Sequence, residues 1–289
     1  MIKTILVPTS GGMTDDAVFA TALSVARPCD AHLEFCHVVI EATDALYNTP
    51  YARSARGQAL KNFFQAAAQE REKRQAVASA HMQDFCKRER ILMADRPTGN
   101  GALSASWHQG KSPAEPYLMA RARHNDLVVV GKPARPNGLP ADFLQNLLRG
   151  CGRPVLIAGS EPPRHLLSTV VVCWNESPEA ARAVAAALPL LVKAHKVEIV
   201  TVDDGEPGCA EAADDMASQL AWHGIRAGAK AIPAQHDGPA DVLAKFVNAC
   251  DADLIVMGGF RRGSLGKSLF GGCTEFMFRH AKRPVFVVN

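Results

Sequence analysis

The stretch VMGGFRRGSLGKSLFGG, residues 256–272, has the residue types and spacing that most clearly suggest chemistry. It follows an apolar run, is rich in glycine, and contains Gly266, Lys267 and Ser268 in succession. Glycine-rich loops bind phosphate because glycine lets backbone N–H groups approach an anion closely. The stretch therefore raises the question of whether a nucleotide binds here.

Two general nucleotide-binding patterns fail at the same position of this stretch. The phosphate-loop pattern GxxxxGK[ST] fits Gly266-Lys267-Ser268 but requires its first glycine at position 261, which is Arg261. The dinucleotide pattern GxGxxG fits Gly263 and Gly266 and again requires glycine at 261. Arginine carries a Cβ and rarely adopts positive φ. Neither pattern therefore predicts a standard nucleotide site.

An anion is still a reasonable ligand for this loop. Gly271 and Gly272 precede a predicted helix, whose free N–H groups and dipole attract negative charge. Arg261 and Arg262 lie nearby in the sequence, and a guanidinium can form two hydrogen bonds with a phosphate. The alternative is that these arginines are solvated side chains on a loop. Both interpretations remain open at the level of sequence.

The elements that must position this loop occur twice along the chain, which predicts a duplicated domain. KTILVPTSGG resembles STVVVCWNES, HNDLVVVG resembles DADLIVMG, and GRPVLIAG resembles KRPVFVVN, in the same order. We place the two domains at residues 1–159 and 166–289, with the linker at Pro162 and Pro163.

The first half carries 38 more residues than the second between matching landmarks. The excess predicts an extra loop and a long polar helix at about residues 41–90. This segment is either a lid or docking arm, or a solvated extension of a helix.

Short β-branched runs alternate with helical patterns in the second half, which predicts a parallel sheet covered by helices on both faces. The expected strands are 168–173, 196–202, 226–232, 253–258 and 284–288, with helices near 178–192, 209–223, 239–250 and 272–281. Ligands bind such sheets beyond the carboxyl ends of the strands, at the switch point in strand order. The glycine-rich stretch follows one of those ends.

Taken together, the sequence resembles a tandem universal stress protein, with two such domains in one chain. The resemblance rests on ILVP and its turn, on DLVVVG and DLIVMG, and on the final RPV strand of each half. It implies two doubly wound, five-stranded parallel sheets of the adenine-nucleotide α-hydrolase-like kind, with strand order 3-2-1-4-5 and a pseudo-two-fold relation. It also implies that the two domains pair through their last strands. A further homodimer is left open.

Nucleotide-binding members of that family carry Gly-x2-Gly-x9-Gly-Ser/Thr after the fourth strand. Gly258 fits the first position and Gly271 the third, whereas Arg261 replaces the second glycine and Gly272 the hydroxyl residue. The resemblance therefore implies a modified nucleotide or anion site in the C-terminal domain.

ATP-binding relatives also place an aspartate after the first strand, where this sequence has Ser10 in one half and Asn175 in the other. Asparagine keeps a similar shape and hydrogen-bonding ability, and Val202 would present backbone groups to an adenine. The first half also has three prolines after VVVG, which remove backbone donors, so its site is expected to be degraded. The candidate site residues are Asn175, Val202, Gly258, Arg261, Arg262, Gly263, Gly271 and Gly272.

The expected function is a non-enzymatic stress-response or signalling module. The alternative is a switch that binds ATP, ADP or AMP in the C-terminal domain, with at most a very slow ATPase activity. The sequence presents no set of nucleophile, base and orienting group. Enzymatic activity is therefore left open, and no catalytic residue is assigned.

The bulk composition limits the classes of partner. The formal net charge is only +3, which does not favour nucleic acid, and no apolar run is long enough for a membrane span. None of the eight cysteines forms a CxxC pair, and no histidine pattern predicts a metal site. We expect a cytoplasmic protein whose cysteines are mostly buried small apolar residues.

Overall fold

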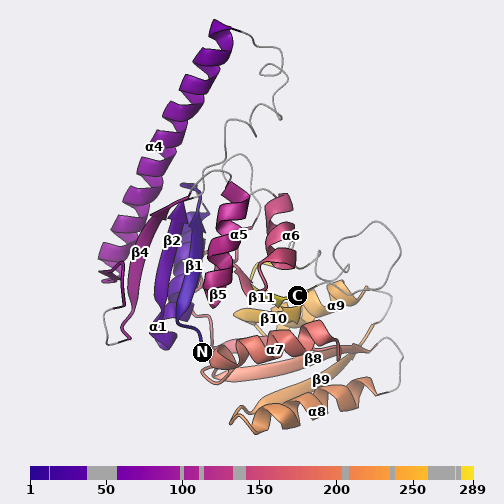
Figure 1. Ribbon diagram of the computed structural model, residues 1–289. Coiled ribbons are helices and arrows are strands. Elements are labelled where there is room, and N and C mark those ends of the chain that lie inside the picture. The colour runs from indigo at the N-terminus through magenta and orange to yellow at the C-terminus, as the bar shows by residue number, and fades with distance from the viewer. Residues whose placement is uncertain are drawn as a thin grey trace.

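The structure is a computed structural model, and it describes residues 1–12, 14–37, 57–97, 101–110, 114–132, 141–203, 208–234, 238–259, 277 and 281–289. Helices and strands alternate along most of the chain and build an α/β fold around a mainly parallel sheet (Figure 1). The strands are β1 Thr4–Thr9, β2 His32–His37, β3 Leu92–Met93, β4 Ser104–Gln109, β5 Leu127–Val130, β6 Val155–Ile157, β7 Thr169–Cys173, β8 Lys196–Asp203, β9 Ala227–Pro233, β10 Leu254–Gly258 and β11 Val285–Val288.

The helices cover both faces of the sheet because each half alternates strand and helix. The helices are α1 Asp15–Cys29, α4 Gln58–Arg88, α5 Ala114–His124, α6 Ala141–Gly150, α7 Pro178–Leu191, α8 Cys209–Ala221 and α9 Pro239–Ala249. On one face, apolar side chains of α1, α4, α7 and α8 pack into a single cluster, and on the other face those of α5, α6 and α9 pack into a second cluster. Helix α4 extends well past the sheet (Figure 1).

The strands form one eleven-stranded sheet in the order β3-β4-β2-β1-β5-β6-β11-β10-β7-β8-β9. Neighbouring strands are parallel except β6 and β11. Within the C-terminal half, β7 to β11 take the order 3-2-1-4-5, and β1, β2, β4, β5 and β6 take the same order in the N-terminal half. The two halves therefore share one sheet, and β3 is an additional outer strand beside β4.

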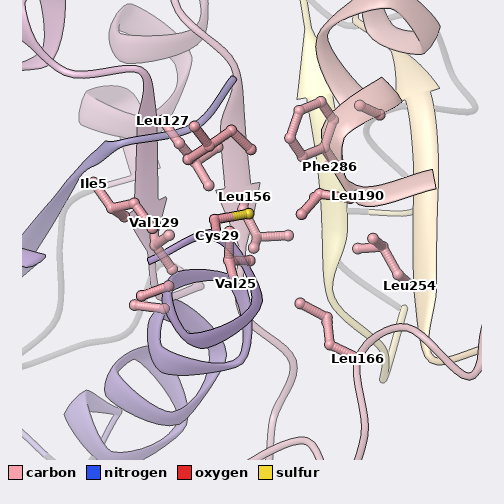
Figure 2. Packing of buried hydrophobic residues seen from close by; sticks show 14 of the residues in the cluster. Ile5, Val25, Cys29, Leu127, Val129, Leu156, Leu166, Leu190, Leu254 and Phe286 are labelled. Atoms are coloured by element: carbon pink, nitrogen blue, oxygen red, sulfur yellow. The ribbon is translucent and has the colours of Figure 1, made fainter. Parts of the chain in front are cut away.

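The junction between the halves is an antiparallel pair of short buried strands. Val285, Phe286 and Val287 of β11 lie opposite Ile157, Leu156 and Val155 of β6. Figure 2 shows Leu156 and Phe286 in one apolar cluster with residues from α1 and α7. The core is therefore continuous across the junction.

Local sequence signals explain the helix that follows the central strand of the C-terminal half. Ser177 is the N-cap of α7, and its Oγ accepts a hydrogen bond from the Ala180 N–H at 3.1 Å. Pro178 occupies the first helical position, where its missing N–H costs nothing. The inward face carries the apolar residues spaced three and four apart in the sequence.

Four of the described cysteines are buried, as expected for small apolar residues: Cys29, Cys36, Cys86 and Cys151. Burial raises the pKa of Cys36 to about 12 and that of Cys86 to about 11. Both are therefore neutral thiols at physiological pH, and neither has the thiolate character of a nucleophile.

We predict that acid destabilises the protein, because of two histidines on β2, His32 and His37. Burial lowers the pKa of both His32 and His37. The unfolded chain then binds more protons than the folded chain as pH falls below about 6.5, so their contribution to stability is lost through that window. Asp15 acts in the opposite direction, because burial raises the pKa of its carboxyl group.

The measurement is the free energy of unfolding in urea at pH 7.5, 6.5 and 5.5, for the natural chain and for His32→Gln. The variant should lose part of the acid sensitivity, since glutamine does not titrate. Equal pH profiles for the two proteins would show that His32 has the same pKa in the folded and unfolded chains, and would contradict the prediction.

Candidate functional site

The carboxyl ends of β7, β8 and β10 form the edge where a ligand is expected in the C-terminal half. β7 lies between β8 and β10, so the strand order reverses at β7. Asn175, Val202 and Gly258 all lie at this edge, two residues beyond β7, near the end of β8 and at the end of β10. The other candidate residues lie outside the described residues: Arg261, Arg262, Gly263, Gly271 and Gly272.

Asn175 is exposed, but its side-chain oxygen is already used within the chain. Asn175 Oδ1 accepts hydrogen bonds from Ser177 Oγ at 2.7 Å and from the Ser177 backbone N–H at 3.3 Å. Those two bonds match the two acceptor sites of an amide oxygen. Asn175 can therefore offer a ligand its N–H donors, which suit acceptor atoms such as phosphate oxygens, whereas an aspartate would accept from hydroxyl groups.

The backbone of Val202 faces the same edge. Trp174 N–H donates to the Val200 carbonyl at 2.9 Å, so Val200 turns its backbone groups toward β7. Because strand residues alternate with a period of two, Val202 turns its N–H and C=O to the same side. β7 ends at Cys173, so these groups face the space beyond its end.

Gly258 has a packing role in addition to any contact with a ligand. A Cβ at this position would lie 2.6 Å from the Ala180 nitrogen and 2.7 Å from the Glu179 carbonyl carbon. The end of β10 therefore approaches the first turn of α7 more closely than any residue with a side chain would allow. This contact alone accounts for glycine at position 258.

The corresponding edge of the N-terminal half is filled by a carboxyl group from the chain itself. Asp15 is 2% exposed and accepts from the Ser10 N–H at 3.3 Å, the Ser10 Oγ at 3.1 Å and the Gly11 N–H at 2.9 Å. Burial raises its pKa, and the hydrogen bonds from Ser10 and Gly11 lower it. The donors that follow β1 are thus turned toward Asp15.

Sequence reasoning missed Asp15, because it looked for an aspartate directly at the end of the first strand, where Ser10 stands. The available signal was an acidic first residue of a helix after a Ser-Gly-Gly turn, since carboxylates favour helix N-termini.

A second group missed from the sequence lies on β2 and β4. Ser106 Oγ lies 2.9 Å from His32 Nε2 and 3.2 Å from His108 Nε2, and His32 Nδ1 lies 2.9 Å from Ser104 Oγ. The alternation Ser104, Ser106, His108 in a strand was its sequence signal. Ser106 is only 2% exposed, lies within a strand and is hydrogen-bonded to both histidines, so we assign this cluster a structural role.

Metal binding and membrane insertion find no support among the described residues. In those ranges, no three His, Cys, Asp or Glu side chains are grouped to hold a metal ion. The helices of the described segments are likewise too short or too polar to cross a bilayer.

Comparison with known proteins identifies a family for the C-terminal half and solved structures with a similar fold. Residues 167–289 match the model of the Universal stress protein family. A universal stress protein from Archaeoglobus fulgidus DSM 4304 has a similar structure, with a TM-score of 0.69 and 15% sequence identity over 99% of this chain and 98% of that chain. No curated protein matches the sequence.

A second structure with a similar fold is a putative universal stress protein from Pseudomonas aeruginosa UCBPP-PA14. Its TM-score is 0.58 and its identity 17%, over 99% of this chain and 93% of that chain. At these identities the structural matches show the fold alone. The C-terminal half therefore contains a universal stress protein domain, and the fold of the whole chain is that of solved universal stress proteins.

Proposed function

We propose that this protein is a universal stress protein-like, non-enzymatic stress-response or signalling module, with a modified nucleotide or anion site in its C-terminal half. The observation that carries the proposal is the contrast between the two sheet edges. The Asp15 carboxyl group accepts the hydrogen bonds of the N–H groups that follow β1, whereas the neutral Asn175, which follows β7, is exposed.

Electrostatics supports a site in the C-terminal half only. An anionic ligand at the start of α1 would meet the oxygens of Asp15, which already bind the Ser10 and Gly11 N–H groups. At the start of α7, Asn175 is uncharged and offers N–H donors, although the carboxylates Glu176 and Asp203 adjoin Asn175 and Val202 in the sequence. A phosphate would therefore meet amide donors from Asn175 at the second edge, in place of the buried Asp15 carboxyl group at the first.

A contact that recurs in both halves supports a tandem arrangement. Asp126 Oδ2 accepts from the Thr4 N–H at 3.1 Å, and Asp253 Oδ2 accepts from the Thr169 N–H at 2.9 Å. The same contact thus joins the first strand to the start of the fourth main strand in both halves. We place the domains at 1–159 and 166–289, paired through β6 and β11 as a built-in dimer.

The second candidate function is a switch driven by ATP, ADP or AMP, with at most slow ATP hydrolysis. It is favoured by the convergence of Asn175, Val202 and Gly258 at one sheet edge. It differs from the first proposal in requiring that nucleotide binding change the state of the protein.

Isothermal titration calorimetry with ATP, ADP, AMP and inorganic phosphate tests the ligand site that both functions share. We expect one site per chain, and Asn175→Ala should weaken it about fivefold, the effect of one ordinary hydrogen bond. Ser10→Ala is the matched control in the N-terminal half and should leave the affinity unchanged. Absence of heat with every ligand at millimolar concentration would contradict a nucleotide or anion site, and clear ATP turnover would contradict a non-enzymatic module.

A further inference from the structure

Lys132 reaches from the N-terminal half to the backbone of the C-terminal half. It lies two residues beyond the end of β5, and its Nζ donates a hydrogen bond to the Ala281 carbonyl oxygen. β5 and β11 are separated by β6, and adjacent strands lie about 4.8 Å apart. The contact thus spans roughly 10 Å at the sheet edge, and it needs a long side chain.

The acceptor belongs to a residue whose own N–H makes a hydrogen bond of the helical, four-residue kind. The Ala281 N–H donates to the Met277 carbonyl at 2.9 Å, and Met277 is helical and 1% exposed. The last carbonyl groups of a helix have no partner within it, and a lysine that donates to one of them also meets the negative end of the helix dipole. Lys132 is placed to cap this carbonyl group from the other half of the chain.

Close packing surrounds the contact. A Cβ on Gly159, which follows β6, would lie 2.6 Å from the Lys282 carbonyl oxygen, so the exit from β6 runs directly against the residue after Ala281. Burial lowers the pKa of Lys132, in agreement with an ammonium group drawn partly out of water. A half-buried ammonium without an acceptor would be costly, which gives the Ala281 carbonyl a specific role.

The chain around Ala281 also leads to the candidate ligand edge. Gly258 ends β10, and the Gly259 N–H donates to the Val288 carbonyl of β11 at 2.7 Å. Ala281 lies four residues before β11. Because β10 and β11 are parallel, Ala281 precedes β11 at the edge opposite Gly258, and β11 carries the chain from the Lys132 contact to the candidate ligand edge.

We propose that Lys132 is a positioning residue that links the two halves by capping the Ala281 carbonyl group, and so fixes the entry of the chain into β11. A change at the end of β5 then reaches β11, whose carboxyl end pairs with the end of β10 at the candidate ligand edge. This link rests on contacts within the folded chain and does not depend on the proposed function.

Hydrogen exchange of the full chain without ligand, followed by mass spectrometry, tests the link. Lys132→Met keeps the length of the side chain but removes the ammonium group. We expect amide exchange in residues 281–288 to become about tenfold faster, as for the loss of one charged hydrogen bond. Lys132→Arg keeps a cationic donor and should restore slow exchange. Lys87→Met is the matched control, since that lysine is exposed on α4.

Two results would overturn the proposal. One is faster exchange confined to β5 when Lys132 is changed, with residues 281–288 as in the natural chain. The other is an arginine variant that loses as much protection as the methionine variant. If Lys132→Met does not fold, nitrogen-15 NMR of the natural protein decides. A capped Lys132 gives an ammonium signal that persists at neutral pH, whereas a solvated one exchanges as fast as Lys87.

Discussion

Phe286→Ala is expected to lower the free energy of unfolding by about 3–5 kcal/mol. Phe286 is 0% exposed and belongs to the apolar cluster on the face covered by α1, α4, α7 and α8. Truncation to alanine removes its buried apolar surface and leaves a cavity that the surrounding side chains fill only in part.

The position of Phe286 at the junction makes this change damaging to both halves of the chain. It pairs with Leu156 across the antiparallel contact between β11 and β6, where the halves meet. Figure 2 shows its ring beside Leu190 of α7 and facing residues from the first half. The cavity would therefore weaken the C-terminal core and the junction together.

Urea unfolding followed by circular dichroism measures the effect, with Trp222→Ala as the control. Trp222 is 91% exposed, so its truncation should change stability by no more than about 0.5 kcal/mol. If both variants unfold at the same urea concentration, the cluster at the junction is not the shared core that its burial indicates.

The strands of the C-terminal half could be predicted from sequence to within about a residue. The expected strand 168–173 is observed as Thr169–Cys173, and 253–258 as Leu254–Gly258. These runs are β-branched, bounded by turn residues and buried on both faces, so local preference and burial agree. The same agreement holds for α7, where Ser177 and Pro178 mark the start and Ala180, Val184, Ala187 and Leu191 are buried.

The outer strand β3 and the Asp15 contact could not be read from the sequence with the same ease. β3 has only two residues, Leu92 and Met93, and both are exposed, so neither length nor burial gives a strand pattern. Asp15 contacts Ser10 and Gly11 only once the turn between them has formed. The family pattern places its aspartate directly after the first strand, so it does not indicate a carboxyl group that reaches the same place from the following helix. Arg261, the position at which all three glycine patterns fail, lies with residues 260–276 outside the described part of the chain.

Gly258→Ala should destabilise the protein by about 1–3 kcal/mol, the usual cost of overpacking. The added Cβ would meet two backbone atoms, the Ala180 nitrogen at 2.6 Å and the Glu179 carbonyl carbon at 2.7 Å. Backbone atoms of a helix cannot rotate aside as a side chain can. The end of β10 and the start of α7 must therefore move apart, and the candidate edge with Asn175 would widen.

Gly131→Ala is the matched control because Gly131 follows β5 in the N-terminal half, against the start of α1. There the nearest atom to an added Cβ is a side-chain methyl carbon of Val18 at 3.1 Å, which can yield by a few tenths of an ångström. Alanine also restricts the unfolded chain, which stabilises a protein by about 0.4–1 kcal/mol where space allows, so this variant should be close to neutral.

Urea unfolding of both variants, with nucleotide titration of the folded proteins, separates packing from binding at position 258. Gly258→Ala should unfold at lower urea concentration than Gly131→Ala and should also bind nucleotide or phosphate more weakly. Equal stability of the two variants would mean that the contact between β10 and α7 is looser than the geometry indicates. Glycine at 258 would then be explained by ligand approach, because a Cβ tolerated by α7 could still exclude a phosphate from the edge.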